Sequence, residues 1–181
     1  SIRKVRRFAE PARDDAWGGS DFTFGDVTLR KPKHDNHELL GKTKFSGCLG
    51  VMKDVKRNKY TQKANIVADC STDGKEVYKL KSTANTANWW YDHRISLIDA
   101  KTFADYRTEY FKGGKHIKTI DRSWASANLD DPRASYWGYW YGKTNTTGHE
   151  TMAFIPSTIT KVNHKYKAKN LWSTRTLKRS E

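Results

Sequence analysis

The fold is decided by residues 106–124, which read YRTEYFKGGKHIKTIDRSW. Apolar and polar residues alternate on both sides of Gly113 and Gly114, and this period of two is typical of a β-strand with one buried face. Two consecutive glycines accept the positive φ angles that the central positions of a type I′ turn require. The stretch therefore predicts an antiparallel β-hairpin that turns at the two glycines.

The position of the turn also predicts which residues lie opposite each other in the hairpin. The expected pairs are Lys112 with Lys115, Phe111 with His116, Tyr110 with Ile117, Glu109 with Lys118 and Thr108 with Thr119. This register divides the side chains into an apolar face with Tyr106, Tyr110 and Ile117 and a charged face with Arg107, Glu109 and Lys118. The apolar face should be buried or should meet a ligand, and the charged face should meet water.

The rest of the chain is punctuated like an antiparallel β protein with few helices. Turn signals that contain glycine fall at residues 18–19, 73–74 and 145–148. A further turn is expected after Asp99, whose carboxylate can accept backbone N–H bonds. Further strands are expected over residues 2–8, 22–29, 64–69, 77–82, 94–98, 136–141 and 151–155. Residues 57–68 and 102–106 are the only segments with a helical character, and both lack good caps.

Composition and length exclude several classes of protein. The chain has 181 residues, of which 36% are hydrophobic and 13% aromatic, enough to bury a core and unlike a disordered segment. An apolar run of roughly 18 residues, as a transmembrane helix needs, is absent from the sequence. We expect residues 1–181 to form a single domain in which residues 163–181 are an extended C-terminal tail. The first residues are charged, so this chain shows no signal peptide.

The chain is strongly basic, with 34 Lys and Arg against 20 Asp and Glu and a formal net charge of +14. Such a charge suits a nucleic-acid binder, a protein that meets anionic membranes, or a solvated basic surface. The basic residues are scattered from Arg3 to Arg179, which favours the solvated surface.

No constellation of catalytic or metal-binding residues emerges from the sequence. His34 and His37 flank Asp35 in a charged segment beside a proline, which indicates a surface loop rather than a zinc site. We therefore expect no enzyme activity, no cofactor and no metal. The two cysteines, Cys48 and Cys70, would form a disulfide in an exported protein and would be buried thiols in a cytosolic one.

Aromatic residues are concentrated in two blocks, residues 89–91 and residues 136–141. They can form a packed core, the wall of a hydrophobic cavity, or a platform on which bases stack. Composition alone favours the core, because large apolar side chains are most often simply buried.

A series of short motifs follows one order along almost the whole chain. They are SIRKVRR at 1–7, GGSDFTFGDV at 18–27, LLGKT at 39–43, IDAKTF at 98–103, GKHIKTI at 114–120, TGHET at 147–151 and LWSTRTLKR at 171–179. The series resembles the outer-membrane lipoprotein-sorting protein family, in its C-terminal major part. The chain departs from the family pattern in a longer, more basic segment at 53–69 and in Ala104-Asp105, where the family usually has leucine and proline.

The resemblance implies a LolA/LolB-like fold, mainly β, in which a curved antiparallel sheet forms an unclosed half-barrel. Members of the family look like periplasmic carriers of Gram-negative bacteria that shelter acyl chains on the concave face of the sheet. Some act beside exporters of the resistance-nodulation-division type, and no catalytic residue or cofactor comes with the family. Members usually carry further strands and a helix before the RKVRR strand, so we expect a truncated or processed chain.

These expectations define a hypothetical ligand cavity and a set of partners. The cavity residues are expected to be Trp90, Ile95, Leu97, Tyr106, Tyr110, Ile117, Trp137, Tyr139, Met152 and Phe154. The partners are a lipid or an acylated lipoprotein, an inner-membrane exporter of the type named above, and a second copy through an open sheet edge. A single-stranded nucleic-acid binder and an adaptor that uses the open edge remain as alternatives. Nucleic acid is not expected, because charged and aromatic side chains should lie on opposite faces of the hairpin.

Overall fold

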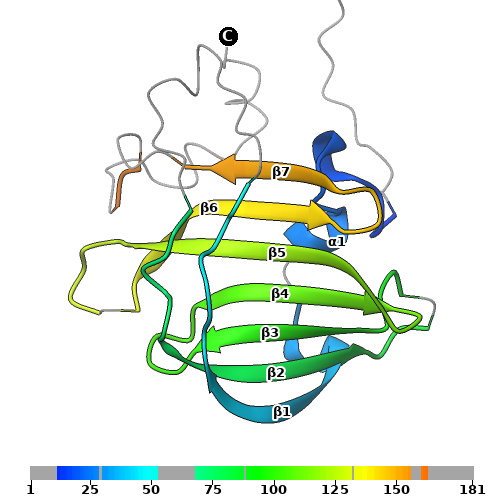
Figure 1. The fold of residues 1–181 in the computed structure, drawn as a ribbon, viewed down its shortest axis with the longest axis horizontal. Helices are drawn as coiled ribbons and strands as arrows, with labels where there is room; N and C mark the ends of the chain where they lie inside the picture. The colour runs from blue at the N-terminus through cyan, green and yellow to red at the C-terminus, as the bar shows by residue number, and fades with distance from the viewer. Residues whose placement is uncertain are drawn as a thin grey trace, which may run out of the picture.

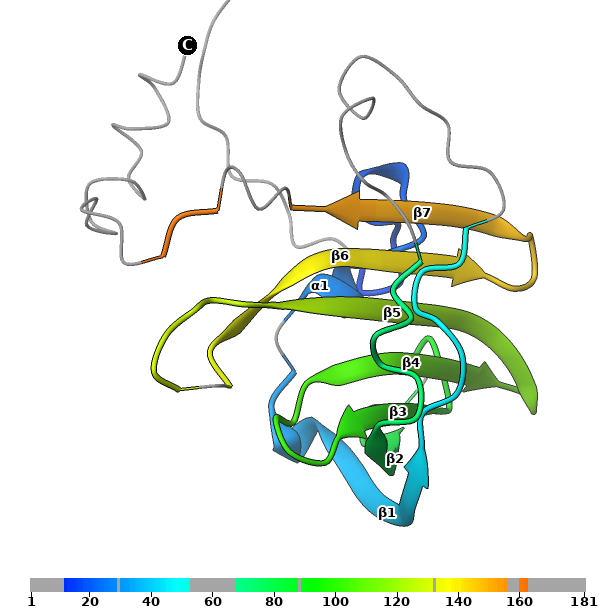
Figure 2. The same ribbon diagram turned by 60° about the vertical axis from the view of Figure 1, so that its left-hand side comes forward.

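Seven antiparallel strands form the sheet, in their order along the chain (Figure 1). The structure, a computed structural model, describes residues 12–28, 30–52, 68–87, 89–131, 133–155 and 160–162. The strands are β1 (Asp35–Lys44), β2 (Glu76–Ala84), β3 (His93–Asp99), β4 (Asp105–Lys112), β5 (Lys115–Ser126), β6 (Ser135–Thr144) and β7 (His149–Phe154). The short helices are η1 (Trp17–Gly19), α1 (Phe24–Val27) and η2 (Pro32–His34). The sheet is unclosed and curved, with β1 at one edge and β7 at the other (Figures 1 and 2).

Most of the expected strands are confirmed. Those over residues 77–82, 94–98, 136–141 and 151–155 correspond to β2, β3, β6 and β7. The expected strand over residues 2–8, most of the one over 64–69 and the tail over 163–181 lie outside the described residues. The described residues contain no helix long and apolar enough to span a membrane.

The hairpin at Gly113 and Gly114 is confirmed, but its expected register is wrong beyond the first two pairs. The two glycines have φ angles of 56° and 73°, as the turn requires. A β-bulge at Ile117 then makes Lys118, rather than Ile117, the partner of Tyr110. One extra residue moves every later side chain to the opposite face. Lys118 therefore lies on the same face as Tyr110, and the expected separation of charged from aromatic residues does not hold.

Two further bulges reassign side chains in the same way. Leu97 pairs with Arg107 while Ile98 pairs with Asp105, so Tyr106 is the extra residue in β4. A second shift falls at Gly138 in β6, between the pairs that Ser123 and Trp124 make. As a result, Tyr106 and Tyr110 lie on opposite faces of the sheet, and so do Trp137 and Tyr139, although strict alternation would place each pair on one face.

The expected strand over residues 22–29 is wrong, because residues 24–27 form the helix α1. Thr23 is its N-cap: the Thr23 Oγ1 accepts the Asp26 N–H at 3.2 Å, and the Asp26 carboxylate accepts the Thr23 N–H at 2.7 Å. This reciprocal capping box satisfies two backbone donors at once and starts a helix where alternation suggested a strand. The expected loop around His34 and His37 is also corrected, since β1 begins at Asp35 and His37 lies within it.

Cross-strand pairing assigns each side chain to one of two faces. The α1 face, against which α1 packs, carries Arg94, Tyr110, Lys118, Ile120, Arg122 and Trp140. The opposite face carries Val77, Leu97, Arg107, Asp121 and Tyr139. We call it the disulfide face, because the disulfide between Cys48 and Cys70 lies over it. Each face has its own hydrophobic cluster, one around Phe22, Tyr91, Tyr110 and Ile120 and the other around Phe45, Leu49, Val77 and Tyr106. Neither face of the sheet is therefore purely solvated.

Two segments cross the disulfide face, residues 45–52 directly after β1 and residues 68–75 directly before β2 (Figures 1 and 2). A disulfide between Cys48 and Cys70 joins them, with Cα atoms 4.2 Å apart. A two-way backbone bridge between Leu49 and Asp69 reinforces the crossing, and the Tyr139 hydroxyl donates to the Leu49 carbonyl at 2.9 Å. The second hydrophobic cluster lies beneath this crossing.

Removing the disulfide should destabilise the protein. The two cysteines are 22 residues apart, and closing a loop of that length contributes about 3 kcal/mol to the free energy of unfolding. We expect urea unfolding of the Cys48→Ala/Cys70→Ala variant to show this loss, and unfolding of the wild type in reductant to show the same loss. A difference between variant and wild type below about 1 kcal/mol would mean that the crossing is held by its other contacts.

Candidate functional site

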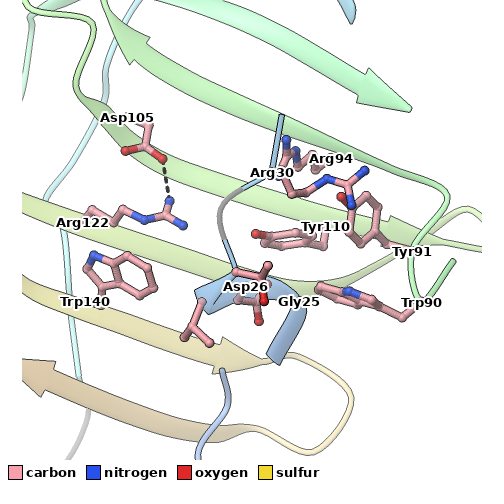
Figure 3. A pocket seen from close by; sticks show the side chains of 12 residues that line it. Gly25, Asp26, Arg30, Trp90, Tyr91, Arg94, Asp105, Tyr110, Arg122 and Trp140 are labelled. Atoms are coloured by element: carbon pink, nitrogen blue, oxygen red, sulfur yellow. Dashed lines mark hydrogen bonds and ion pairs between the residues drawn. The ribbon is translucent and has the colours of Figure 1, made fainter. Parts of the chain in front are cut away.

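A pocket of about 330 Å³ lies on the α1 face, between the sheet and the segment that carries α1 (Figure 3). Its walls come from α1, from residues 90–94 and from β4, β5 and β6. The lining residues are Gly25, Asp26, Val27, Thr28, Arg30, Trp90, Tyr91, Arg94, Asp105, Tyr110, Arg122 and Trp140. A volume of a few hundred cubic ångströms is the size of ordinary small-molecule sites.

A buried ion pair ties α1 to the sheet beside this pocket. The Lys118 Nζ lies 2.6 Å from the Asp26 carboxylate, and both side chains are almost fully buried. The same ammonium lies 4.4 Å from the centre of the Trp90 ring, a cation–π distance. The pair therefore holds α1 over β5 and neutralises Lys118 on a face that is otherwise rich in aromatic rings.

Glycine allows α1 to approach closely. A Cβ at Gly25 would lie 2.8 Å from the Trp90 Nε1 and 2.8 Å from the backbone carbonyl oxygen of Arg13. Both distances are shorter than side-chain carbons tolerate, so a larger residue would push α1 away from the pocket.

The segment before α1 is anchored to the far end of the sheet by Asp21. Its carboxylate accepts hydrogen bonds from the hydroxyls of Thr144 and Thr151, each at 2.6 Å, and contacts the His149 Nδ1 at 2.7 Å. Burial alone would raise the pKa of the Asp21 carboxyl, but these hydrogen bonds outweigh it and lower the pKa below its usual value. Asp21 thus stays ionised where it joins the N-terminal segment to β6 and β7.

Two arginines share one buried carboxylate at one end of the pocket. Asp35, at the start of β1, accepts two hydrogen bonds from Arg30, at 2.9 and 2.7 Å, and one from the Arg94 Nη2 at 3.1 Å. Arg30 also packs over the Trp89 ring at 4.6 Å. Among the described residues, two guanidinium groups thus share a single carboxylate.

A third arginine lies at the other end of the pocket (Figure 3). The Arg122 Nη1 donates to the Asp105 carboxylate at 2.8 Å, and the guanidinium lies 4.6 Å from the centre of the Trp140 ring. Desolvation raises the pKa of the Asp105 carboxyl, and the nearby Arg122 and Arg94 counteract part of that rise.

Aromatic rings form the wall between the two charged ends. Trp90 stacks on Tyr110 with ring centres 4.9 Å apart, and Tyr91 meets Tyr110 edge to face at 5.1 Å. Burial strongly raises the pKa of Tyr110, so its hydroxyl remains a proton donor at neutral pH. The pocket is therefore amphiphilic, with arginines at its ends and aromatic rings between them.

Several polar atoms of the lining residues are buried without a hydrogen-bond partner among the described residues. They are Asp26 Oδ1, Trp90 Nε1, Tyr91 Oη, Arg94 Nε and Trp140 Nε1. Buried polar groups in folded proteins are normally satisfied, and a group of exceptions around one pocket calls for a physical explanation.

The ten cavity residues expected from the sequence do not share one face, which corrects that expectation. Four of them, Trp90, Tyr110, Ile117 and Trp137, belong with the α1 face. The other six, Ile95, Leu97, Tyr106, Tyr139, Met152 and Phe154, lie on the disulfide face. Only Trp90 and Tyr110 line the pocket. The bulge at Tyr106 separates this residue from Tyr110, and the bulge at Gly138 separates Trp137 from Tyr139. Ile95 and Leu97 differ from Tyr110 for another reason, because they lie opposite Glu109 and Arg107 in the register of β3 and β4.

Sequence reasoning missed the charged residues of the pocket. Arg94 and Arg122 occupy inward positions of strands, and a cation at an inward position of an amphipathic strand is itself an anomaly that could have marked them. Asp26 had no comparable signal, because its partner Lys118 is remote in sequence. Asp35 has one partner nearby, Arg30, but its pairing with Arg94 is also remote in sequence.

The fold belongs to a known class. An unclosed antiparallel meander with a helix-bearing segment against one face is a LolA/LolB-like fold, and three solved structures show the likeness. No protein-family model matches the chain, and no curated protein sequence matches it.

The likeness is to structures of distant sequence. An outer membrane lipoprotein-sorting protein domain from Vibrio parahaemolyticus has a TM-score of 0.56 and 15% identity over 83% of this chain and 54% of its own. A DUF1329 family protein from Desulfovibrio piger has a TM-score of 0.58 and 15% identity over 82% of this chain and 51% of its own. A LolA superfamily protein from Nitrosomonas europaea has a TM-score of 0.52 and 13% identity over 89% and 64%. The chain thus spans between 51% and 64% of the lengths of these proteins.

Proposed function

We propose that this chain is a carrier that binds a lipid, the acyl chains of a lipoprotein or another hydrophobic ligand, without catalysing a reaction. The observation that carries the proposal is the aromatic pocket between α1 and the sheet of a LolA/LolB-like fold. A carrier needs apolar concave surface, because each methylene group hidden from water stabilises the bound state by about 0.8 kcal/mol. Trp90, Tyr110 and Trp140 supply such surface at the pocket.

The proposal extends to the place of action. It assigns the chain to the periplasm of a Gram-negative bacterium, in outer-membrane lipoprotein sorting or in lipid export beside a resistance-nodulation-division exporter. The likeness to a lipoprotein-sorting domain supports the first role. The outermost strand β1 exposes Leu39 and Leu40, so pairing with a second copy through this edge belongs to the proposal as well.

A carrier is preferred to a nucleic-acid binder, although cations and aromatic rings do share the α1 face. Lys118 and Arg122 are nearly buried and are paired with Asp26 and Asp105. A single-strand binder presents its cations along an open groove, where phosphates can reach them.

The test is whether the protein as purified from a Gram-negative host carries a lipid. Native mass spectrometry followed by organic extraction should find a bound lipid or fatty acid in the wild type. Thr28→Trp should abolish it, because Thr28 is an exposed residue on the pocket wall and an indole there fills the pocket. Thr83→Trp is the matched control, another exposed threonine but on the disulfide side of β2, and should keep the ligand. A wild type that neither carries nor takes up a lipid contradicts the proposal.

A further inference from the structure

The charges around the pocket do not balance. The cations are Arg30, Arg94, Arg122 and Lys118, and the carboxylates are Asp26, Asp35 and Asp105. Lys118 and Arg122 each have a carboxylate of their own, whereas Arg30 and Arg94 share Asp35. Among the residues that the structure describes, the pocket therefore has one cation more than it has carboxylates.

Among the four cations, Arg94 is the one with a buried N–H donor that has no partner among the described residues. A guanidinium offers five N–H donors, and Arg94 makes one hydrogen bond among the described residues, from Nη2 to Asp35. Its Nε is buried without a partner, while the side chain as a whole is 21% exposed at the pocket. Arg30, by contrast, uses Asp35 in a two-pronged contact and also donates to the His34 carbonyl at 2.9 Å.

The surroundings of Arg94 favour an anion over a neutral polar group. Tyr110 lies between Arg94 and Arg122 in the pocket, with its hydroxyl held protonated by burial (Figure 3). Two guanidinium groups and a hydroxyl are all hydrogen-bond donors. Charge-assisted hydrogen bonds to a carboxylate or phosphate are about twice as strong as bonds between neutral groups. Such a ligand would also supply the missing negative charge.

We infer that the pocket binds the carboxylate or phosphate head group of an anionic amphiphile, with Arg94 as the principal contact and Arg122 as the second. The inference rests on the proposed carrier function and names the class of ligand that the carrier takes. The head group lies against the two arginines, and the first part of the chain lies against Trp90, Tyr110 and Trp140. Arg94 thus selects an anionic ligand in addition to pairing with Asp35.

The experiment compares amphiphiles that share a tail and differ in charge. Dodecyl phosphate and dodecanoate are the anionic probes, dodecyl maltoside is the neutral probe, and inorganic phosphate is the head group without a tail. Isothermal titration below the micelle concentration should show the anionic probes binding at least about tenfold more tightly than the neutral one. Inorganic phosphate should bind far more weakly than dodecyl phosphate, because it gains nothing from the aromatic wall.

Arg94→Gln should remove the preference for charge. We expect it to weaken both anionic probes by about tenfold or more and to change dodecyl maltoside less than twofold. Arg94→Lys should be intermediate, because it keeps the charge and loses the planar fork. Arg133→Gln is the matched control, the same substitution at an exposed arginine on the loop between β5 and β6, and should bind as the wild type does.

Each result separates the two proposals. Equal binding of charged and neutral probes, unaffected by Arg94→Gln, overturns the head-group inference and leaves the carrier standing. No binding of any amphiphile overturns the carrier. Inorganic phosphate that binds as tightly as dodecyl phosphate, through Arg94, keeps the anion site and overturns the carrier. If Arg94→Gln does not fold, Arg122→Gln provides the same comparison at the other end of the pocket.

Discussion

Arg107→Met is expected to lower the free energy of unfolding by about 3–5 kcal/mol, the usual loss when one partner of a buried ion pair is removed. The Arg107 guanidinium donates to both carboxylate oxygens of Asp121, at 2.7 and 2.8 Å. Asp121 is 1% exposed and also accepts the Gly50 N–H at 2.9 Å. Without the arginine, a carboxylate remains in the interior with only that backbone donor.

Because of where the Arg107–Asp121 pair lies, Arg107→Met should lower the free energy of unfolding by more than the loss of these two hydrogen bonds alone would. Arg107 also donates to the Cys48 carbonyl at 3.2 Å and lies 5.4 Å from the centre of the Phe45 ring. The pair thus fastens the segment after β1 to the centre of the sheet, beneath the disulfide. Asp121 holds the same segment from the other side through Gly50.

Chemical denaturation measures this effect, and a double variant checks its origin. Arg107→Met/Asp121→Leu should recover much of the loss, because replacing both charges removes the unpaired carboxylate. Arg133→Met is the control, since the Arg133–Asp131 pair is exposed and should leave the free energy of unfolding nearly unchanged. If the single variant Arg107→Met is as stable as the wild type, the carboxylate of Asp121 is not buried as the structure has it.

Phe22→Ala is expected to cost about 3–5 kcal/mol, the range for deleting a buried aromatic ring. Phe22 is 1% exposed, belongs to the cluster on the α1 face and meets Trp140 edge to face at 5.7 Å. Gly142 in β6 makes room for it, because a Cβ there would lie 3.0 Å from the Phe22 Cε1. Deleting the Phe22 ring should therefore leave a cavity, because Gly142 has no side chain that could fill the space.

The same substitution should also disturb the pocket, because Phe22 immediately precedes the cap and the four residues of α1. We expect Phe22→Ala to weaken binding of dodecanoate, measured at a temperature where the variant is still folded. Phe103→Ala is the matched control, since Phe103 is 63% exposed and its truncation should cost less than about 1 kcal/mol. A folded Phe22→Ala variant with wild-type stability would contradict the placement of the N-terminal segment on the sheet.

Local chemistry explains the features that could be predicted from the sequence. The hairpin at Gly113 and Gly114 requires only that these two residues accept positive φ. The turn after Asp99 requires only its own carboxylate, which accepts the N–H groups of Lys101 and Thr102 at 2.8 and 2.7 Å. Period-two alternation places the strands because a β-strand presents its side chains to opposite faces.

The assignment of side chains to faces could not be predicted in the same way. A bulge adds a single residue, and nothing in the alternation at Ile117 or Tyr106 marks where it falls. The predicted strand over residues 22–29 was wrong for a related reason. The reciprocal hydrogen bonds between Thr23 and Asp26 outweighed the alternation and started α1.

The sequence by itself determined a mainly antiparallel sheet, most of its strands and its turns, because these depend on neighbours within a few residues. Only the tertiary structure decided that Lys118 and Arg94 face inward, where Asp26, 92 residues from Lys118, and Asp35, 59 residues from Arg94, pair with them. Burying a cation is costly unless an opposite charge pairs with it, and these partners come together only once distant parts of the chain have folded onto each other. The pocket and its proposed preference for an anionic ligand therefore depend on contacts between distant parts of the chain.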